Sequence, residues 1–259
     1  SEASERGSGP FPQHTYTRLD PAKALPHLKL YNVGDMVVVT DAAKKAYDAH
    51  PGFTRSFEDG PYAVYRVNGG DTGYVVAATN EPVLYDGPDW KLALYRWFKH
   101  HELIDIPLVP GALLGETEAR RFIWRTDAIN RVPRVPIEGR CQVTSRLEQY
   151  KITVETGCPG RPHIVKVSYF PRWRTTDGSR LLPVSPGFMM VWPKSSRLEI
   201  VYGTNTVDAV GLAMTGGGLL LLLALVVRPG FAARTTARLS VRMEPAGRFL
   251  ERHALVVFL

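Results

Sequence analysis

Residues 209–227 read AVGLAMTGGGLLLLLALVV, nineteen consecutive residues without a charged side chain. A helix of this length, at about 1.5 Å per residue, nearly matches the hydrocarbon core of a bilayer, which is about 30 Å thick. The alternative is a buried helix of a soluble protein, but such helices seldom run so far without an outward-facing polar residue. The stretch therefore predicts a transmembrane helix, and its small residues at 211 and 215–218 favour packing against a partner helix in the membrane.

Arginines follow the apolar stretch directly. The formal net charge of the chain is +7, and residues 228–259 hold six arginines against two glutamates. An excess of basic residues is typical of the cytoplasmic flank of a membrane helix. We therefore expect residues 228–259 to form a basic cytoplasmic tail at the cell membrane, with the bulk of the chain outside the cytoplasm. The dispersed charge of the remaining residues does not favour nucleic-acid binding.

The beginning of the sequence is polar and lacks an apolar signal stretch. Residues 1–27 are interpreted as a flexible lead-in, because their first part is rich in Ser, Gly and Pro. Without an initiator Met or an export signal, the chain is expected to be part of a longer polypeptide whose earlier segment crosses the membrane. A cloning remnant or an incomplete gene would give the same beginning.

Residues 28–136 are predicted to form a small α/β unit. Short β-branched and amphipathic runs alternate there, and the turn sequence Glu58-Asp59-Gly60-Pro61 separates two of the strands. The expected elements are a strand at 35–40, a helix at 41–47, strands at 53–57 and 62–67, and a helix at 90–98 whose apolar face points inward.

From residue 137 onward the apolar residues recur with a period of two, and one hairpin can be placed in register. If Gln149-Tyr150 is the turn, residues whose numbers sum to 299 face each other, which pairs Leu147 with Ile152. The same register brings Cys141 opposite Cys158, with Cα atoms about 4.5 Å apart and within reach of a disulfide. Two free thiols remain the alternative, because Gln-Tyr is not a favoured two-residue turn.

Further strands are expected at 164–170, 187–192 and 198–202, separated by turn sequences. Such short, regularly spaced strands are typical of a β-sandwich, which we place at residues 137–208. The predicted fold class is thus α+β: a small α/β unit, then an antiparallel β-sandwich, then a transmembrane helix.

The order of these motifs resembles the C-terminal part of YfhO-type bacterial membrane proteins. The resemblance is carried by VKVSYFPRWR at 165–174, the Asp177-Gly178 turn, PGFMMVWP at 186–193 and LEIVYG at 198–203, followed by the apolar helix. Upstream, LYNVGDMVV at 30–38 and GPYAVYRV at 60–67 are similar to the small α/β unit of the same family.

This resemblance implies a membrane glycosyltransferase of the GT-C type, which transfers sugar from a polyprenyl-phosphate carrier to an acceptor on the outer membrane face. In such enzymes the catalytic acidic residue lies in an outer loop near the N-terminus, among many membrane helices. This sequence contains no such region, so no catalytic residue is assigned. The expected function is that of an extracytoplasmic accessory region, with membrane lipid, the lipid-linked sugar and a glycan acceptor as partners. A non-enzymatic envelope scaffold or a glycan-binding module is the alternative.

Aromatic residues on the expected strands are the candidate ligand contacts. Tyr169, Trp173 and Trp192 would stack on sugar rings if they faced outward, although strand aromatics more often pack between the sheets of a sandwich. No cofactor is expected, and no metal, because the histidines show no ligand spacing. The run Gly69-Gly70-Asp71-Thr72-Gly73 lacks the Gly-Lys-Ser/Thr ending of a phosphate loop and is interpreted as a hairpin turn.

Overall fold

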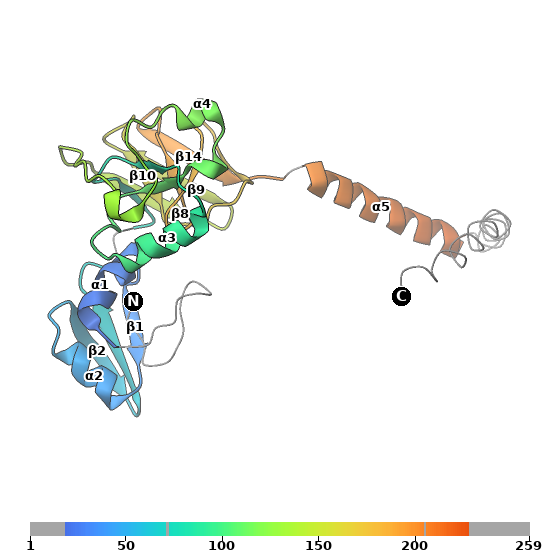
Figure 1. The fold of residues 1–259 in the computed structure, drawn as a ribbon. Helices are drawn as coiled ribbons and strands as arrows, with labels where there is room; N and C mark the ends of the chain where they lie inside the picture. Colours follow the sequence, from blue (N-terminus) through green and yellow to red (C-terminus); the bar gives the residue numbers. More distant parts are fainter. Residues whose placement is uncertain (1–18, 71–72, 205, 228–259) are drawn as a thin grey trace, which may run out of the picture. The chain divides into compact units, whose positions relative to one another are not determined.

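The computed structural model describes residues 19–70, 73–204 and 206–227, and it divides into two units at Gly203 (Figure 1). The first unit holds all the sheets, and the second holds the C-terminal helix. The basic tail expected at residues 228–259, and the part of the lead-in at residues 1–18, lie outside the described residues. The α+β class, with sandwiched antiparallel sheets before one apolar helix, is confirmed.

The small α/β unit begins the described chain. Its antiparallel sheet has the order β1-β3-β2, and Gly60, at a φ of 52°, makes the turn between β2 and β3. Helices α1 and α2 bury apolar side chains against the inward-facing positions Ala63, Tyr65 and Val67 of β3. The elements are α1 (Pro21–Leu30), β1 (Asp35–Val38), α2 (Asp41–Asp48), β2 (Phe53–Asp59) and β3 (Tyr62–Val67).

Helix α1 corrects the expected lead-in, because it occupies residues that were assigned to a flexible segment. The side chain of Asp20 accepts a hydrogen bond from the backbone N–H of Lys23 and caps the helix, and Pro21 fits the first turn because that turn needs no N–H donor. The α/β unit therefore starts before residue 28. Helix α1 forms one wall of a pocket in this part of the molecule.

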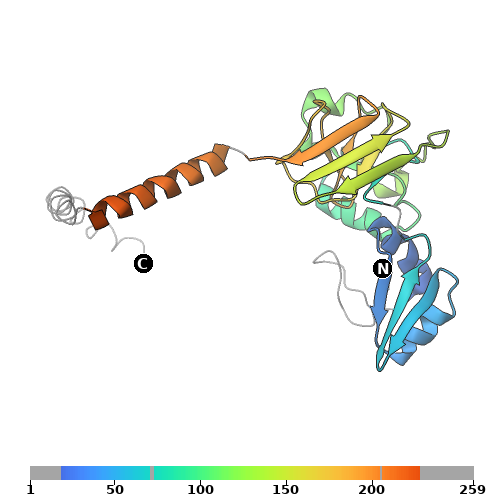
Figure 2. The ribbon, with the colours of Figure 1, turned by 180° about the vertical axis from the view of Figure 1, so that it is seen from behind.

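Two four-stranded antiparallel sheets form the β-sandwich. Their order is β12-β13-β10-β4 in one sheet and β11-β14-β9-β8 in the other, which Figure 2 shows with β14 in orange beside β9 in yellow. The core between them includes Val154, Val165 and Ile200. The strands are β4 (Val75–Ala77), β8 (Val143–Leu147), β9 (Lys151–Thr156), β10 (His163–Val165), β11 (Trp173–Thr175), β12 (Leu182–Val184), β13 (Phe188–Val191) and β14 (Arg197–Tyr202).

The β8–β9 hairpin has the register expected from the sequence. Leu147 pairs with Ile152 and Val143 with Thr156, so that Gln149 and Tyr150 form the turn. Beyond the paired residues, the backbone N–H of Gly157 donates to the carbonyl of Gln142 at 3.0 Å, which carries the same register toward the cysteines.

The expected division at residues 136/137 does not match the strand pairing. β4 was assigned to the α/β unit, but it pairs with β10 of the sandwich, Val75 opposite Val165. The segment after β4 adds a parallel sheet of order β6-β5-β7, with α3 connecting its first two strands in sequence. Its elements are β5 (Val83–Tyr85), α3 (Trp90–Lys99), β6 (Leu108–Pro110), α4 (Glu116–Ala119) and β7 (Arg125–Thr126), with short 3-10 turns at Gly111–Leu113 and Ile129–Arg131.

The parallel sheet forms a middle layer between the sandwich and α3. On β13, Met189 packs into the sandwich core, whereas Met190 packs on the opposite side, in a cluster with Leu84 of β5. On β5, Val83 faces away from Leu84 and packs with the apolar face of α3, including Trp97. Alternation along each strand thus explains why β5 and β13 are buried on both faces.

The second unit contains α5 (Thr206–Val227), a helix of 22 residues that begins three residues before the predicted stretch. It is long and apolar enough to cross a membrane, with a mean hydropathy of 2.4 over its most apolar part. None of its described side chains is buried in the protein.

Candidate functional site

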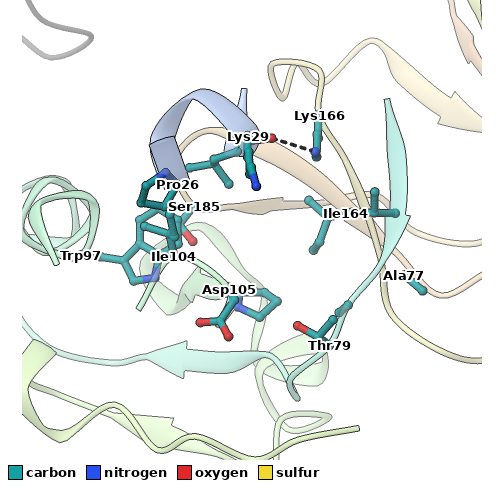
Figure 3. A pocket seen from close by; sticks show the side chains of 14 residues that line it. Pro26, Lys29, Ala77, Thr79, Trp97, Ile104, Asp105, Ile164, Lys166 and Ser185 are labelled. Carbon is teal, nitrogen blue, oxygen red and sulfur yellow. Dashed lines mark hydrogen bonds between the residues drawn. The ribbon is translucent and has the colours of Figure 1, made fainter. Parts of the chain in front are cut away.

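A pocket of about 550 Å³ lies between α1, β4, β10 and the segment that follows α3, and we call it the α1 pocket. This volume falls within the range of about 300–1,000 Å³ that is usual for small-molecule sites. Figure 3 shows Lys29 and Lys166 at one side of the pocket, with Asp105 and Thr79 at the other. The walls are mainly apolar. The lining residues are Pro26, Lys29, Leu30, Val76, Ala77, Ala78, Thr79, Trp97, Ile104, Asp105, Pro107, Ile164, Lys166 and Ser185.

Helix α1 is held in place by polar contacts at its C-terminal half. The imidazole of His27 is buried, and its Nε2 lies 2.7 Å from the carbonyl oxygen of Phe98 at the end of α3. The ammonium of Lys166 donates to the carbonyl of Lys29 at 3.2 Å, which places a positive charge at the C-terminal end of the helix dipole (Figure 3). These contacts join α1 to the parallel layer and to the segment after β10, and they fix one wall of the pocket.

The charged groups of the pocket leave an excess of positive charge. The carboxylate of Asp105 is compensated, because its Oδ1 accepts from Nη2 of Arg134 at 2.9 Å and its Oδ2 accepts from the amide of Asn80 at 3.1 Å. The hydrogen bonds that Arg134 donates to the Asp105 carboxylate raise the pKa of Arg134. Within the described part of the chain, Lys29 forms no ion pair. An anionic group would therefore find a complementary charge at Lys29.

A second hollow of about 490 Å³ lies beside the parallel sheet, and we call it the Trp192 hollow. The indole of Trp192 packs edge-on against the ring of Phe122, with ring centroids 5.9 Å apart. Trp124 is positioned by its backbone carbonyl, which accepts from the N–H of Leu84 at 2.9 Å. The lining residues are Glu81, Pro82, Arg121, Phe122, Ile123, Trp124, Val135 and Trp192.

The three aromatic residues predicted from the sequence do not form one site. Tyr169 and Trp173 are half-buried and pack against the core of the sandwich, where the ring of Trp173 also contacts Tyr202 at 5.1 Å between centroids. Trp192 packs on the cluster that contains Leu84, and it lines the Trp192 hollow. Ligand binding by Tyr169 and Trp173 stays a prediction.

Of the residues that line the two cavities, sequence reasoning named only Trp192 as a candidate ligand contact. The α1 pocket depends on α1, and the pair Asp20-Pro21 is a helix-start signal that could have revealed it. The Trp192 hollow depends on the run Phe122-Ile123-Trp124, an apolar segment between arginines that shows no strand or helix period. Neither cavity could be assembled from sequence alone, because each draws on segments far apart in the chain.

The structure joins Cys141 and Cys158 in a disulfide, with Cα atoms 5.8 Å apart. Beside it, Thr156 Oγ1 lies 2.7 Å from Nε2 of the buried His163, whose Nδ1 lies 2.8 Å from the carbonyl oxygen of Arg161. Burial lowers the pKa of His163. The two sulfurs and this imidazole lie within 4.8 Å of one another, but sulfurs that are bonded to each other are not the thiolates that zinc requires.

Comparison with known proteins adds no relative: no family model, curated protein or solved structure matches the chain. The YfhO-type resemblance therefore stays a prediction, and the two cavities and the apolar helix are the observations from which function can be argued.

Proposed function

We propose that the chain is a membrane-tethered binding region outside the cytoplasm, and that it serves as the accessory part of a membrane glycosyltransferase that uses polyprenyl-phosphate-linked sugar. The observation that carries this proposal is the α1 pocket, which combines an apolar wall with the ammonium of Lys29. That combination suits a ligand with an apolar body and one anionic group. The pocket binds the lipid carrier in this proposal, and no residue of the chain is assigned a catalytic role.

The chemistry of the pocket favours a phosphate-bearing lipid over a neutral one. Pro26, Ile104 and Ile164 offer apolar surface for a hydrocarbon chain, and burying such a chain contributes about 0.8 kcal/mol per methylene. The phosphate accepts hydrogen bonds from Lys29, and charge-assisted bonds of this kind are stronger than neutral ones. Asp105 does not repel the phosphate strongly, because Arg134 compensates its charge.

Three features support a location at the outer face of the membrane. Helix α5 is able to span a bilayer. The Cys141–Cys158 disulfide fits an oxidising compartment, since disulfides rarely persist in the cytosol. The arginine-rich residues that follow α5 in the sequence favour a cytoplasmic position for that end of the helix.

The proposal is tested with the full chain in lipid nanodiscs and three probes: geranylgeranyl phosphate, geranylgeraniol and inorganic phosphate. We expect saturable binding of geranylgeranyl phosphate, observed as a change in tryptophan fluorescence to which Trp97 contributes, and much weaker binding of the other two. Lys29→Met should weaken binding of the lipid phosphate by about tenfold or more, whereas Lys29→Arg should retain most of it.

Lys23→Met is the matched control, because Lys23 lies on the same helix and does not line the pocket. Binding that is equal for the phosphate and the alcohol, or that is unchanged by Lys29→Met, would contradict the proposal. Maleimide labelling of single cysteines introduced before and after α5 tests the proposed orientation separately.

A further inference from the structure

We infer that the Trp192 hollow is a carbohydrate-binding site, in which Trp124 and Trp192 contact the faces of a sugar ring and Arg121 and Glu81 bind its hydroxyl groups. The inference does not depend on lipid binding in the α1 pocket. It concerns a separate cavity, on the parallel layer, and assigns it a neutral, polyhydroxylated ligand.

The first argument is the combination of aromatic and polar groups. Two indoles line one hollow, and 39% of the surface of Trp124 is exposed, so that its ring is accessible to a ligand. A pyranose ring has apolar C–H faces and a rim of hydroxyl groups. Aromatic rings provide large, rigid contact area for the faces, and a few well-placed polar groups fix the orientation of a ligand.

The second argument is that the polar side chains of the hollow have no hydrogen-bond partner within the described part of the chain. Among residues 19–70, 73–204 and 206–227, the side chains of Glu81 and Arg121 form no hydrogen bond or ion pair, and neither indole N–H of Trp124 and Trp192 donates one. The hollow thus offers three donor groups and one carboxylate acceptor. Hydroxyl groups both donate and accept hydrogen bonds, so a sugar can satisfy all of them.

The third argument is charge. One guanidinium and one carboxylate line the hollow, so its formal charge is balanced. This distinguishes it from the α1 pocket, where Lys29 forms no ion pair among the described residues. A balanced site favours a neutral sugar over a phosphate or a basic peptide. The volume of about 490 Å³ lies within the usual range for small-molecule sites and is sufficient for a small oligosaccharide unit.

The site rests on a rigid support. Phe122 is buried and holds the ring of Trp192 edge-on at 5.9 Å between centroids, while the backbone of Trp124 is bonded to β5. The backbone N–H of Glu81 donates to the carbonyl of Val135 at 2.8 Å. This hydrogen bond fixes the backbone just before β5, where the side chain of Glu81 is attached. Rigid placement of this kind lowers the entropic cost of binding.

The experiment uses the full chain in nanodiscs and the methyl glycosides of glucose, galactose, mannose and N-acetylglucosamine, with saturation-transfer NMR and tryptophan fluorescence as readouts. We expect at least one glycoside to bind saturably in the millimolar range. Trp124→Ala should weaken that binding by about tenfold, Trp124→Phe should restore part of it, and Glu81→Gln should change the order of preference among the four glycosides.

Tyr62→Ala is the matched control, because Tyr62 is an exposed aromatic residue outside both cavities. Thermal unfolding checks that Trp124→Ala is folded. Absence of saturable binding for all four glycosides, or an equal effect of Trp124→Ala and Tyr62→Ala, would overturn the inference. Lys29→Met should leave glycoside binding unchanged, so failure of the lipid proposal and failure of this inference give different results.

Discussion

At the scale of single residues, burial and hydrogen bonding together fix the position and the protonation state of His163. The imidazole is fully buried between Thr156 and the carbonyl of Arg161, and the nearby positive charge of Arg161 acts with desolvation to keep it neutral. Its position on β10 was not predicted to matter, because a lone histidine in a sequence carries no sign of its surroundings.

The lowered pKa of His163 predicts a pH-dependent stability. In the unfolded chain this group takes up a proton near its ordinary pKa of 6.5, whereas in the folded protein it does so only at lower pH. Its contribution is therefore complete above pH 6.5 and is lost as the pH falls toward the folded pKa. We expect His163→Gln to reduce the loss of melting temperature between pH 7 and pH 5.

The control for this measurement is His101→Gln, since His101 is about half exposed. That variant should keep the pH dependence of the wild-type protein. The same slope for wild type and His163→Gln would show that His163 does not govern stability in this range.

Trp173 permits a second test at this scale, one that separates packing from ligand binding. Its side chain packs on the sandwich core and against Tyr202, so Trp173→Ala should lower the free energy of unfolding by about 3 kcal/mol, as measured by urea denaturation. Tyr150→Ala, at an exposed position beside the same Tyr202 ring, should cost less than about 1 kcal/mol. Unchanged stability with lost glycoside binding would instead assign Trp173 to a site.

At the scale of elements, the sequence was sufficient to predict helices and strand pairs whose contacting residues are close along the chain. The β8–β9 register follows from alternation around Gln149-Tyr150, and α3 follows from the helical spacing of its apolar residues. The parallel strands β5, β6 and β7 were not predicted, because two or three residues give no period. Pairing of β4 with β10 joins residues far apart in sequence, which no local signal encodes.

The size of the loop that the Cys141–Cys158 disulfide closes predicts how much the disulfide stabilises the fold. Cys141 and Cys158 are 17 residues apart, and closing a loop of this size stabilises a fold by about 3 kcal/mol, largely by constraining the unfolded chain. Cys141→Ser with Cys158→Ser should therefore lower the free energy of unfolding by about that amount in urea. The wild-type protein under reducing conditions should show the same loss, and a loss below about 1 kcal/mol in both would contradict the argument.

At the scale of the whole molecule, the length and apolar composition of α5 predict association with a membrane. The full chain should remain with membranes after alkaline carbonate extraction, because the helix is apolar on all sides. Arginines near its centre, introduced as Leu219→Arg with Leu220→Arg, each cost about 2.5–3.5 kcal/mol of insertion free energy and should release the protein. Val207→Arg, in the first turn, should have little effect, because a long side chain there reaches the interface. Release of the wild-type protein would refute a spanning role for α5.

Strand β4 has one further consequence. Because it completes a sheet with β10, and also contacts β8, the parallel layer with α3 is an insertion between neighbouring strands of a single sandwich. A protein cut at residue 136 would yield two pieces that each lack part of one sheet, so they should be obtainable only by co-expression, as complementing fragments. The insertion, in contrast, carries most of the residues that line the Trp192 hollow, so exchanging it as one block would test the proposed carbohydrate site.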